Sequence, residues 1–289
     1  MFKTILVPVR GDGGDKASLG TAFAVATLFD GHIDVVHVQS TLPPLAPSTG
    51  SSATQLMSGL KFASALRESG KDRRDYARRH YRQFCANAKI QQTGASPTTK
   101  SVSAAWIDCE GNEVDQIIHM AHRHDLIVLR ATSVGDGGFS PDEAGEIILS
   151  RGGPVMLAPP HPSSGFAGTI AIAWKKTPEA ASALSAAMPL LYRADKIVVI
   201  AVATDDDGSD PTIDDVVMRL RWHGLDAAAD PIKANQSLPA RCLMEHVESL
   251  GADLLVMGAY GRNRMREYIF GSFTKNVLSG ASLPVFLTH

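Results

Sequence analysis

Short, continuous apolar runs alternate with longer stretches of helical pattern along this chain. The runs at 5–9 and 170–174 are apolar at nearly every position, which is typical of strands in a parallel sheet that is covered on both faces. Each run is followed by small and apolar residues at helical spacing, at 17–28 and 178–191. The pattern therefore predicts alternating strands and helices in both halves of the chain.

The same elements recur in the same order in the two halves. The matched apolar runs are 5–9 with 170–174, 32–38 with 196–202, 125–129 with 253–257, and 154–157 with 284–287. Such self-similarity in one fixed order indicates a tandem duplication. The first strands, at Ile5 and Ile170, are 165 positions apart, and the fourth strands, at Asp125 and Asp253, are 128 apart, so the first copy carries 37 more residues in its middle.

The extra residues of the first copy form two features. One is a loop rich in Pro, Ser and Thr at 41–52, and the other is a long helical pattern over about 56–90. The second copy crosses the same region with an acidic loop at 204–210 and a short helical pattern that ends near Gly224. We therefore expect the two copies to differ mainly between their second and third strands.

The repeated strand–helix unit predicts the fold class. Such units connect through right-handed crossovers, so each copy is expected to be an α/β domain with a doubly wound sheet of about five parallel strands. We assign the domains to residues 1–158 and 168–289, because three prolines and two serines in 159–165 cannot continue a helix or strand. Ligands of such sheets bind beyond the carboxyl ends of the strands, where the strand order reverses. We therefore expect any ligand site at the turns that follow Val9, Leu129, Trp174 and Met257.

Composition and charge narrow the class of protein. Lys and Arg number 28 against 30 for Asp and Glu, a formal charge of −2, which argues against a nucleic-acid-binding protein that depends on phosphate contacts. No apolar run approaches the roughly 20 residues that a membrane-spanning helix needs. The three cysteines include no CxxC pair, so we expect no disulfide framework and a cytoplasmic location.

A glycine-spaced segment follows the fourth strand of the second copy. Gly258, Gly261 and Gly271 are separated by two and nine residues, and Ser272 begins a helical pattern. Glycines allow the backbone to approach an anion closely, and the N–H groups at a helix N-terminus favour phosphate. Arg262, Arg264 and Arg266 lie between these glycines and could neutralise phosphate oxygens. Neither a GxxxxGK[ST] nor a GxGxxG motif occurs in the chain.

With its flanking strands, this segment resembles the ATP-binding branch of the universal stress protein family. The resemblance covers the whole chain as two tandem domains and is stronger in the second copy. It implies two Rossmann-like, adenine nucleotide alpha hydrolase-like domains and ATP, with Mg²⁺, as ligand of the second. The glycine loop would hold phosphates and ribose, and the first strand would border the nucleoside. The implied binding residues are Ala173, Trp174, Met257, Gly258, Gly261, Arg262, Gly271, Ser272, Phe273 and Thr274.

The chain departs from the family pattern in both copies. The family places an Asp just after the first strand, whereas this chain has Arg10 and Lys175 there, and a cation cannot accept a hydrogen bond from a ribose hydroxyl. In the first copy Arg130 and Ser133 replace the first two loop glycines, and Asp136 and Asp142 would repel phosphate. We therefore expect no ATP binding of the family kind in the first domain.

Motifs for catalysis and for metal binding are missing. The chain contains no GxSxG and no HExxH, and Glu267 is the one candidate general base near the expected γ-phosphate. Cys242, His246 and His223 lack a fourth ligand for zinc, so we expect a structural role for them. The resemblance thus implies a regulatory or stress-survival protein that is at most a weak ATPase. A scaffold or interaction module without nucleotide, and a slow ATPase, remain the alternatives.

Two clusters of charged or ionisable residues are interpreted as surface features and not as binding sites. His119, His122 and His124 precede the fourth strand of the first copy and are interpreted as the exposed end of a helix, where cationic His is favourable. Residues 67–82 carry seven basic and three acidic side chains, which we interpret as a solvated helix face.

Domains of the family that this chain resembles commonly pair through their final strands, and the final strand of each copy is an apolar edge candidate. These strands, at 154–157 and 284–287, can pair antiparallel within one chain and so form an intrachain pseudo-dimer. The connecting residues 158–167 reach up to roughly 33 Å when extended, which is long enough for this pairing. Any homodimer would then use other surfaces, for which the long helix at 56–90 is a candidate.

Overall fold

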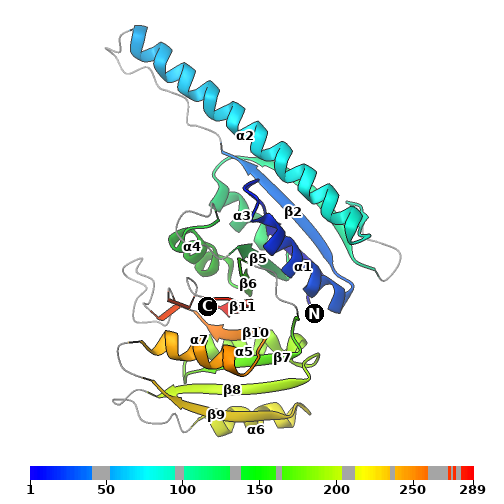
Figure 1. Cartoon of the computed structure of the whole chain (residues 1–289), viewed down its shortest axis with the longest axis vertical. Coiled ribbons are helices and arrows are strands. Elements are labelled where there is room, and N and C mark those ends of the chain that lie inside the picture. Colours follow the sequence, from blue (N-terminus) through cyan, green and yellow to red (C-terminus); the bar gives the residue numbers. More distant parts are fainter. Residues whose placement is uncertain are drawn as a thin grey trace.

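The computed structural model describes residues 1–40, 53–94, 101–130, 138–160, 165–203, 212–234, 238–259, 273–274, 276–277 and 281–289. Among these residues the strands form an 11-stranded sheet in the order β3-β4-β2-β1-β5-β6-β11-β10-β7-β8-β9. The sheet runs through both halves of the chain, as Figure 1 shows. Apart from one antiparallel pair at its centre, its neighbouring strands are parallel.

Each half contributes five of the main strands in the same order. The first half contains β1 (Thr4–Pro8), β2 (His32–Gln39), β4 (Ser103–Glu110), β5 (Leu126–Arg130) and β6 (Val155–Ala158), and the second contains β7 (Thr169–Trp174), β8 (Lys196–Ala203), β9 (Ala227–Lys233), β10 (Leu254–Gly258) and β11 (Val285–Thr288). In both halves the first strand lies between the second and the fourth. The predicted α/β class and doubly wound order are therefore confirmed, and the order reverses beside β1 and β7. The two-residue strand β3 (Gln91–Gln92), which pairs with β4, was not predicted.

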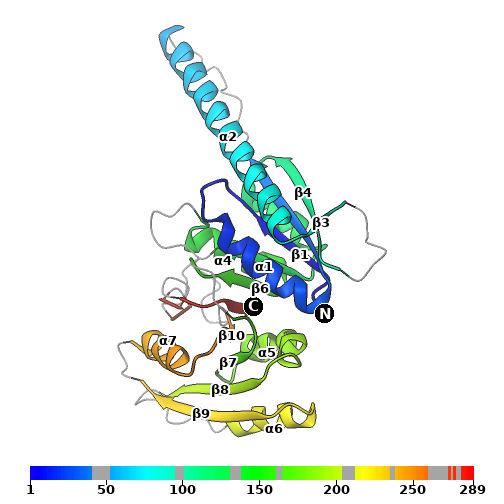
Figure 2. The same ribbon diagram turned by 45° about the vertical axis from the view of Figure 1, so that its right-hand side comes forward.

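Helices cover both faces of the sheet. One face packs against α1 (Asp15–Phe29), α2 (Ala53–Asn87), α5 (Pro178–Leu191) and α6 (Ile213–Trp222), and the other against α3 (Glu113–Ala121), α4 (Pro141–Arg151) and α7 (Pro239–Ser249). Figure 2 shows α5 and α7 on either side of β7 and β10. This double cover explains why the strands are apolar at successive positions.

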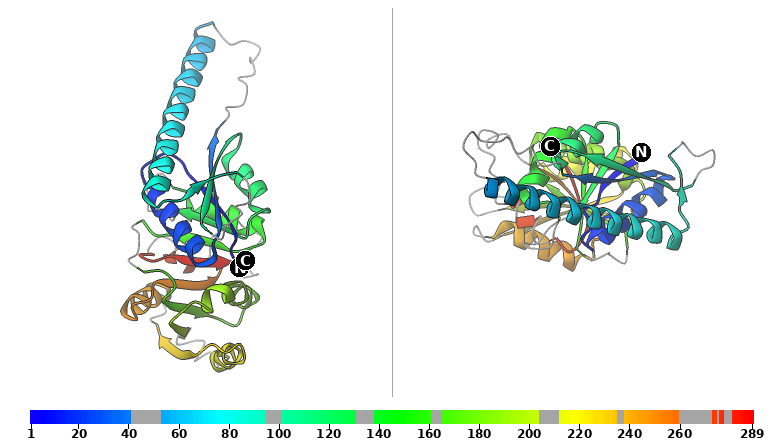
Figure 3. Two further views of the ribbon diagram at one scale, coloured as in Figure 1. Left: turned by 90° about the vertical axis from the view of Figure 1, so that its right-hand side faces the viewer. Right: turned by 90° about the horizontal axis from the view of Figure 1, so that it is seen from above.

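The helix α2 is much longer than the sheet it packs on. Its 35 residues correspond to about 52 Å at 1.5 Å per residue, and the helix extends past the body of the molecule in Figures 1 and 3. Its C-terminal part is anchored by Ala77, Tyr81 and Cys85, which are spaced one turn apart and are all buried. None of the described helices is long and apolar enough to cross a membrane.

The two halves meet through the last strand of each. β6 and β11 pair antiparallel, with Met156 opposite Phe286 and Leu157 opposite Val285. Phe2 contacts the Phe286 ring edge-on, with 5.8 Å between the ring centroids. This is the strand pairing that the sequence predicted, and it leaves neither apolar strand as an open edge.

Candidate functional site

The carboxyl ends of β7 and β10 bring together four of the expected binding residues. Met257 is the register partner of Ala173, and the next residues along the two strands are Gly258 and Trp174. Met257 is buried, whereas the other three residues are partly exposed. The Trp174 indole Nε1 donates to Thr212 Oγ1 at 2.9 Å, just before α6 begins. The strand-order reversal of the second domain is thus lined by these residues.

Gly258 is a glycine because the start of α5 lies against it. A Cβ atom at this position would be 2.5 Å from the backbone nitrogen of Ala180 and 2.6 Å from the carbonyl carbon of Glu179. Backbone atoms cannot rotate away, so a larger residue would force β10 and α5 apart. The glycine that opens the predicted nucleotide loop therefore allows a helix N-terminus to approach the end of the strand.

Glu179 adds a carboxylate that the sequence did not single out. The residue is 6% exposed, and its Oε2 atom has no hydrogen-bond partner among the described residues. Its backbone carbonyl accepts from Thr288 Oγ1 at 3.4 Å, and Thr288 is the register partner of Gly258. A Glu in the first turn of a helix is common, so only the tertiary structure reveals that this one is buried beside the glycine.

The centre of the predicted loop lies outside the described residues. This applies to Gly261, Arg262, Gly271 and Ser272, as well as to Arg264, Arg266 and Glu267. At the far end of the loop, Phe273 and Thr274 are helical, and Thr274 is buried. The strand that enters the loop and the helix that leaves it are therefore placed as the sequence predicted.

In the first domain, Arg10 holds the position of Lys175 and is bound by two carboxylates. Its guanidinium lies 2.7 Å from Glu113 Oε2 and 2.8 Å from Glu143 Oε1, and it also donates to the carbonyl oxygen of Gly138 at 2.6 Å. The Phe139 ring lies beneath it, 4.0 Å from centroid to guanidinium carbon. The Arg10 side chain and its partners thus occupy the space beyond the carboxyl ends of the strands in the first domain.

The N-terminus of α4 is satisfied by its own side chains. Ser140 Oγ accepts from the backbone N–H of Glu143, and Glu143 Oε2 accepts from the backbone N–H of Ser140 at 2.7 Å, which completes a capping box. Burial alone would raise the pKa of Glu143, but the hydrogen bonds from Arg10 and Ser140 hold it below its usual value. A carboxylate therefore already occupies the place where a phosphate would bind a helix N-terminus.

The two domains have a glycine at different positions of the corresponding contact: at the start of α1 in the first domain and at the end of β10 in the second. By the spacing of the repeat, Arg130 corresponds to Gly258 and Gly14 to Glu179. A side chain at Gly14 would overlap the guanidinium of Arg130, which lies 2.7 Å from Asp12 Oδ2. In the first domain the glycine at the helix start leaves room for the Arg130 side chain, and in the second the glycine at the strand end leaves room for the backbone of the helix start.

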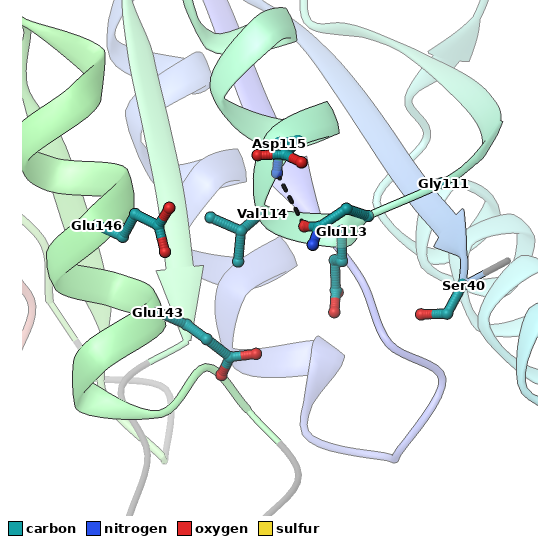
Figure 4. Close-up of a pocket in the computed structure, with 8 residues that line it drawn as sticks. Ser40, Gly111, Glu113, Val114, Asp115, Glu143 and Glu146 are labelled. Carbon is teal, nitrogen blue, oxygen red and sulfur yellow. Dashed lines mark hydrogen bonds between the residues drawn. The ribbon is translucent and has the colours of Figure 1, made fainter. Parts of the chain in front are cut away.

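An acidic cavity of about 450 Å³ lies beside this closed site (Figure 4). Its lining consists of Ser40, Gly111, Asn112, Glu113, Val114, Asp115, Glu143 and Glu146. Asn112 caps α3 by accepting from the Asp115 N–H at 3.2 Å, the bond drawn in the figure. Four carboxylates in one cavity repel a polyphosphate, which supports the expectation that the first domain does not bind ATP in the family manner.

Of the three histidines interpreted as an exposed helix end, His119 and His122 do lie at the end of α3, but the interpretation is wrong for His124. His124 is not at an exposed helix end, because its side chain is only 5% exposed and its Nε2 lies 2.9 Å from Asp34 Oδ2. His32 approaches the other oxygen of Asp34 at 3.1 Å. The two imidazoles thus flank one carboxylate at the amino end of β2, and the sequence spacing of 90 residues concealed this pairing.

The two histidines considered for zinc make other contacts. His246 Nε2 lies 2.7 Å from Asp230 Oδ2, and His223 Nδ1 lies 3.4 Å from the Tyr192 hydroxyl. No group of three or more metal-binding side chains occurs within the described ranges.

Comparison with known proteins shows the same two-domain architecture elsewhere. A model of the universal stress protein family matches residues 1–139 and 168–289. A universal stress protein from Archaeoglobus fulgidus DSM 4304 superposes with a TM-score of 0.71 at 16% identity, covering 99% of this chain and 97% of that one. A putative universal stress protein from Pseudomonas aeruginosa UCBPP-PA14 gives 0.53 at 14% identity, covering 99% and 93%. At these identities the two structures establish the fold alone.

Among curated proteins, the stress response protein NhaX of Bacillus subtilis (strain 168) is 27% identical over 82 residues. The match covers 28% of this chain and 48% of NhaX. The chain therefore spans about half the length of that relative.

Proposed function

This chain belongs to the universal stress protein family, and we propose that it is a cytoplasmic regulator of stress survival that binds ATP in its second domain. The observation that carries the proposal is Gly258, the first glycine of the G-x2-G-x9-G-S segment, held between the end of β10 and the start of α5. Gly258 lies at the reversal of strand order, where ligands of doubly wound sheets bind.

The surrounding residues suit a nucleotide. Ala173 and Trp174 are partly exposed at the strand ends and offer surface for the base, and the buried Met257 lies beside Ala173. We expect the N–H groups at Gly261, Gly271 and Ser272 to bind phosphate oxygens, with Arg262 neutralising charge. Phe273 and Thr274, beyond the loop, are helical. Mg²⁺ would enter with the phosphates, which supply ligands of the kind that this ion prefers.

The acceptor for the sugar is the part of the site that differs from the family pattern. Lys175 cannot accept a hydrogen bond, but its charge favours a phosphate. Glu179 supplies a buried carboxylate with an oxygen that lacks a partner in the described part of the chain. A ribose hydroxyl donating to this carboxylate would satisfy it, and we assign Glu179 this role.

Two observations favour a second candidate, an interaction module that uses no nucleotide. Lys175 replaces the family Asp, and the first domain has filled its own site with Arg10, Glu113 and Glu143. Mass spectrometry of the natively purified protein separates the two candidates, because co-purified ATP or ADP would contradict the second. A slow ATPase is dismissed if turnover at saturating ATP equals that of buffer.

Titration calorimetry with ATP and Mg²⁺ on the whole chain tests the proposal. We expect saturable binding with one ATP per chain, and its loss in Gly261→Val, because the added side chain blocks the approach of phosphate to the backbone. The matched control is Ser133→Val in the first copy, which should bind as the parent does. Absence of heat from wild-type protein at millimolar ATP would refute nucleotide binding.

A further inference from the structure

The outer face of α6 exposes large apolar side chains. Trp222 is 84% exposed and Met218 is 52% exposed, although the opposite face of the same helix is buried. Tyr192, 55% exposed, borders the C-terminal end of this face through its contact with His223. Scattered apolar residues are normal on a surface, but an exposed Trp and Met on one helical turn form a patch of the kind found at protein interfaces.

Charged residues continue the patch along the helix in opposite signs. Asp214 and Asp215 are exposed in the first turn, and Arg221 is exposed in the last turn. Asp214, Met218, Arg221 and Trp222 follow the spacing i, i+4, i+7 and i+8, which places them on one side of a helix. None of the three charged side chains has an ion-pair partner among the described residues.

We infer that this face binds α6 of a second copy of the chain, antiparallel and about a twofold axis near Met218. A twofold interface places residue i opposite residue j and j opposite i. Antiparallel pairing then sets the acidic first turn of one copy against the partner's last turn, which carries Arg221 and Trp222, twice, with the two Met218 side chains near the axis. The charge pattern of α6 is therefore complementary to itself, which is the reason to assign the patch to a second copy.

The edge strand β9, next to α6, is a less suitable surface for pairing between two chains than α6 is. β9 is the outermost strand of the second domain, and an outermost strand is the usual place for pairing between chains. Pro231 lies within it and has no N–H to donate. α6 also lies at the opposite end of the molecule from the projecting helix α2, as Figures 1 and 3 show. The dimer would therefore be elongated, with the two α2 helices at its far ends.

Sedimentation velocity on the whole chain tests the inference. A contact made by one helix on each side buries a small area, so we expect a weak dimer and choose protein concentrations of about 5 to 200 µM. We expect a concentration-dependent dimer for wild type. Trp222→Ser should weaken it by about thirtyfold, as expected for a central interface aromatic. Glu245→Arg, a charge reversal on the exposed face of α7, is the matched control and should not change the dimer. A wild-type chain that stays monomeric throughout this range would overturn the inference.

Charge reversals separate a true interface from a damaged fold. Asp214→Arg puts Arg opposite the partner's Arg221, and Arg221→Asp puts Asp opposite the partner's Asp214, so each variant alone should be monomeric. Mixing the two variants in equal amounts restores both opposite-charge contacts, and the mixture should sediment as a heterodimer. Dimers in either single variant, or a mixture that remains monomeric while wild type dimerises, would overturn the antiparallel arrangement.

Discussion

The guanidinium of Arg130 occupies the space that a side chain at Gly14 would need. In the second domain the counterpart of Arg130 is Gly258, and the counterpart of Gly14 is Glu179. Both domains thus have a glycine where the end of the fourth strand meets the start of the first helix, on the helix side in the first domain and on the strand side in the second. In the first domain the Arg130 side chain lies against the glycine, whereas in the second the backbone of the helix start lies against it.

Gly258→Ala should destabilise the protein by about 2 kcal/mol, because the new methyl group meets backbone atoms of Glu179 and Ala180. Chemical denaturation monitored by circular dichroism measures the change. Gly20→Ala is the matched control: Gly20 lies within α1, with no atom within 4 Å of the added methyl group. This variant should gain up to about 1 kcal/mol from helix propensity. Equal effects of the two variants would contradict the close contact at Gly258.

Arg10→Met should destabilise the first domain by about 1 to 2 kcal/mol. It leaves Glu113 and Glu143 without their shared cation in a half-buried position, and partial exposure limits the penalty. Adding Glu143→Gln should recover part of this loss, because one of the two unpaired charges is then removed. Urea denaturation of the single and double variants gives the coupling. Strictly additive losses would show that Arg10 acts by packing on Phe139 alone.

Stability should fall in acid partly because of Asp34. Burial alone would raise its pKa, but hydrogen bonds from His124 and His32 hold it well below the ordinary value. A carboxyl whose pKa is depressed in the folded state stabilises the protein fully above the pKa of the unfolded chain, near 3.9, and this stabilisation is lost as the pH falls further. The free energy of unfolding, measured from about pH 6 to pH 2, should therefore decline less steeply in Asp34→Asn than in wild type. Asp30→Asn, at the exposed C-cap of α1, serves as the control and should keep the wild-type slope.

A fragment of residues 166–289 should self-associate through β11. Removal of the first domain exposes the edge that β6 covers, and an open apolar edge recruits another strand. The fragment should carry Trp222→Ser so that the face of α6 does not contribute. Analytical ultracentrifugation at tens of micromolar should then show dimers or aggregates. A well-behaved monomer would mean that β11 does not need β6.

The expected order of elements rests on hydrophobic pattern alone, and the structure agrees with it closely. Runs such as 5–9 and 170–174 are apolar because both faces of a parallel strand are buried, and this requirement acts residue by residue. The repeat and the long helix α2 follow from the same local signals, whereas the pairing of the last strands was expected from the resemblance to the family and from the need to cover an apolar edge. The glycine loop was likewise visible as a spacing, and its entering strand and leaving helix lie where that spacing predicted.

What tertiary structure alone decided is which distant side chains meet. Arg10 is bound by carboxylates 103 and 133 positions away, and His124 is buried on Asp34 from 90 positions away. In the sequence Glu179 is an ordinary Glu of a first helical turn, and only the packing of β10 against α5 shows that it is buried. Local periodicity reports whether a residue faces the core, but a charged contact depends on how separate elements are brought together. The sequence therefore determined the fold, whereas packing between elements determined that Arg10, Glu113 and Glu143 fill the end of the sheet in the first domain.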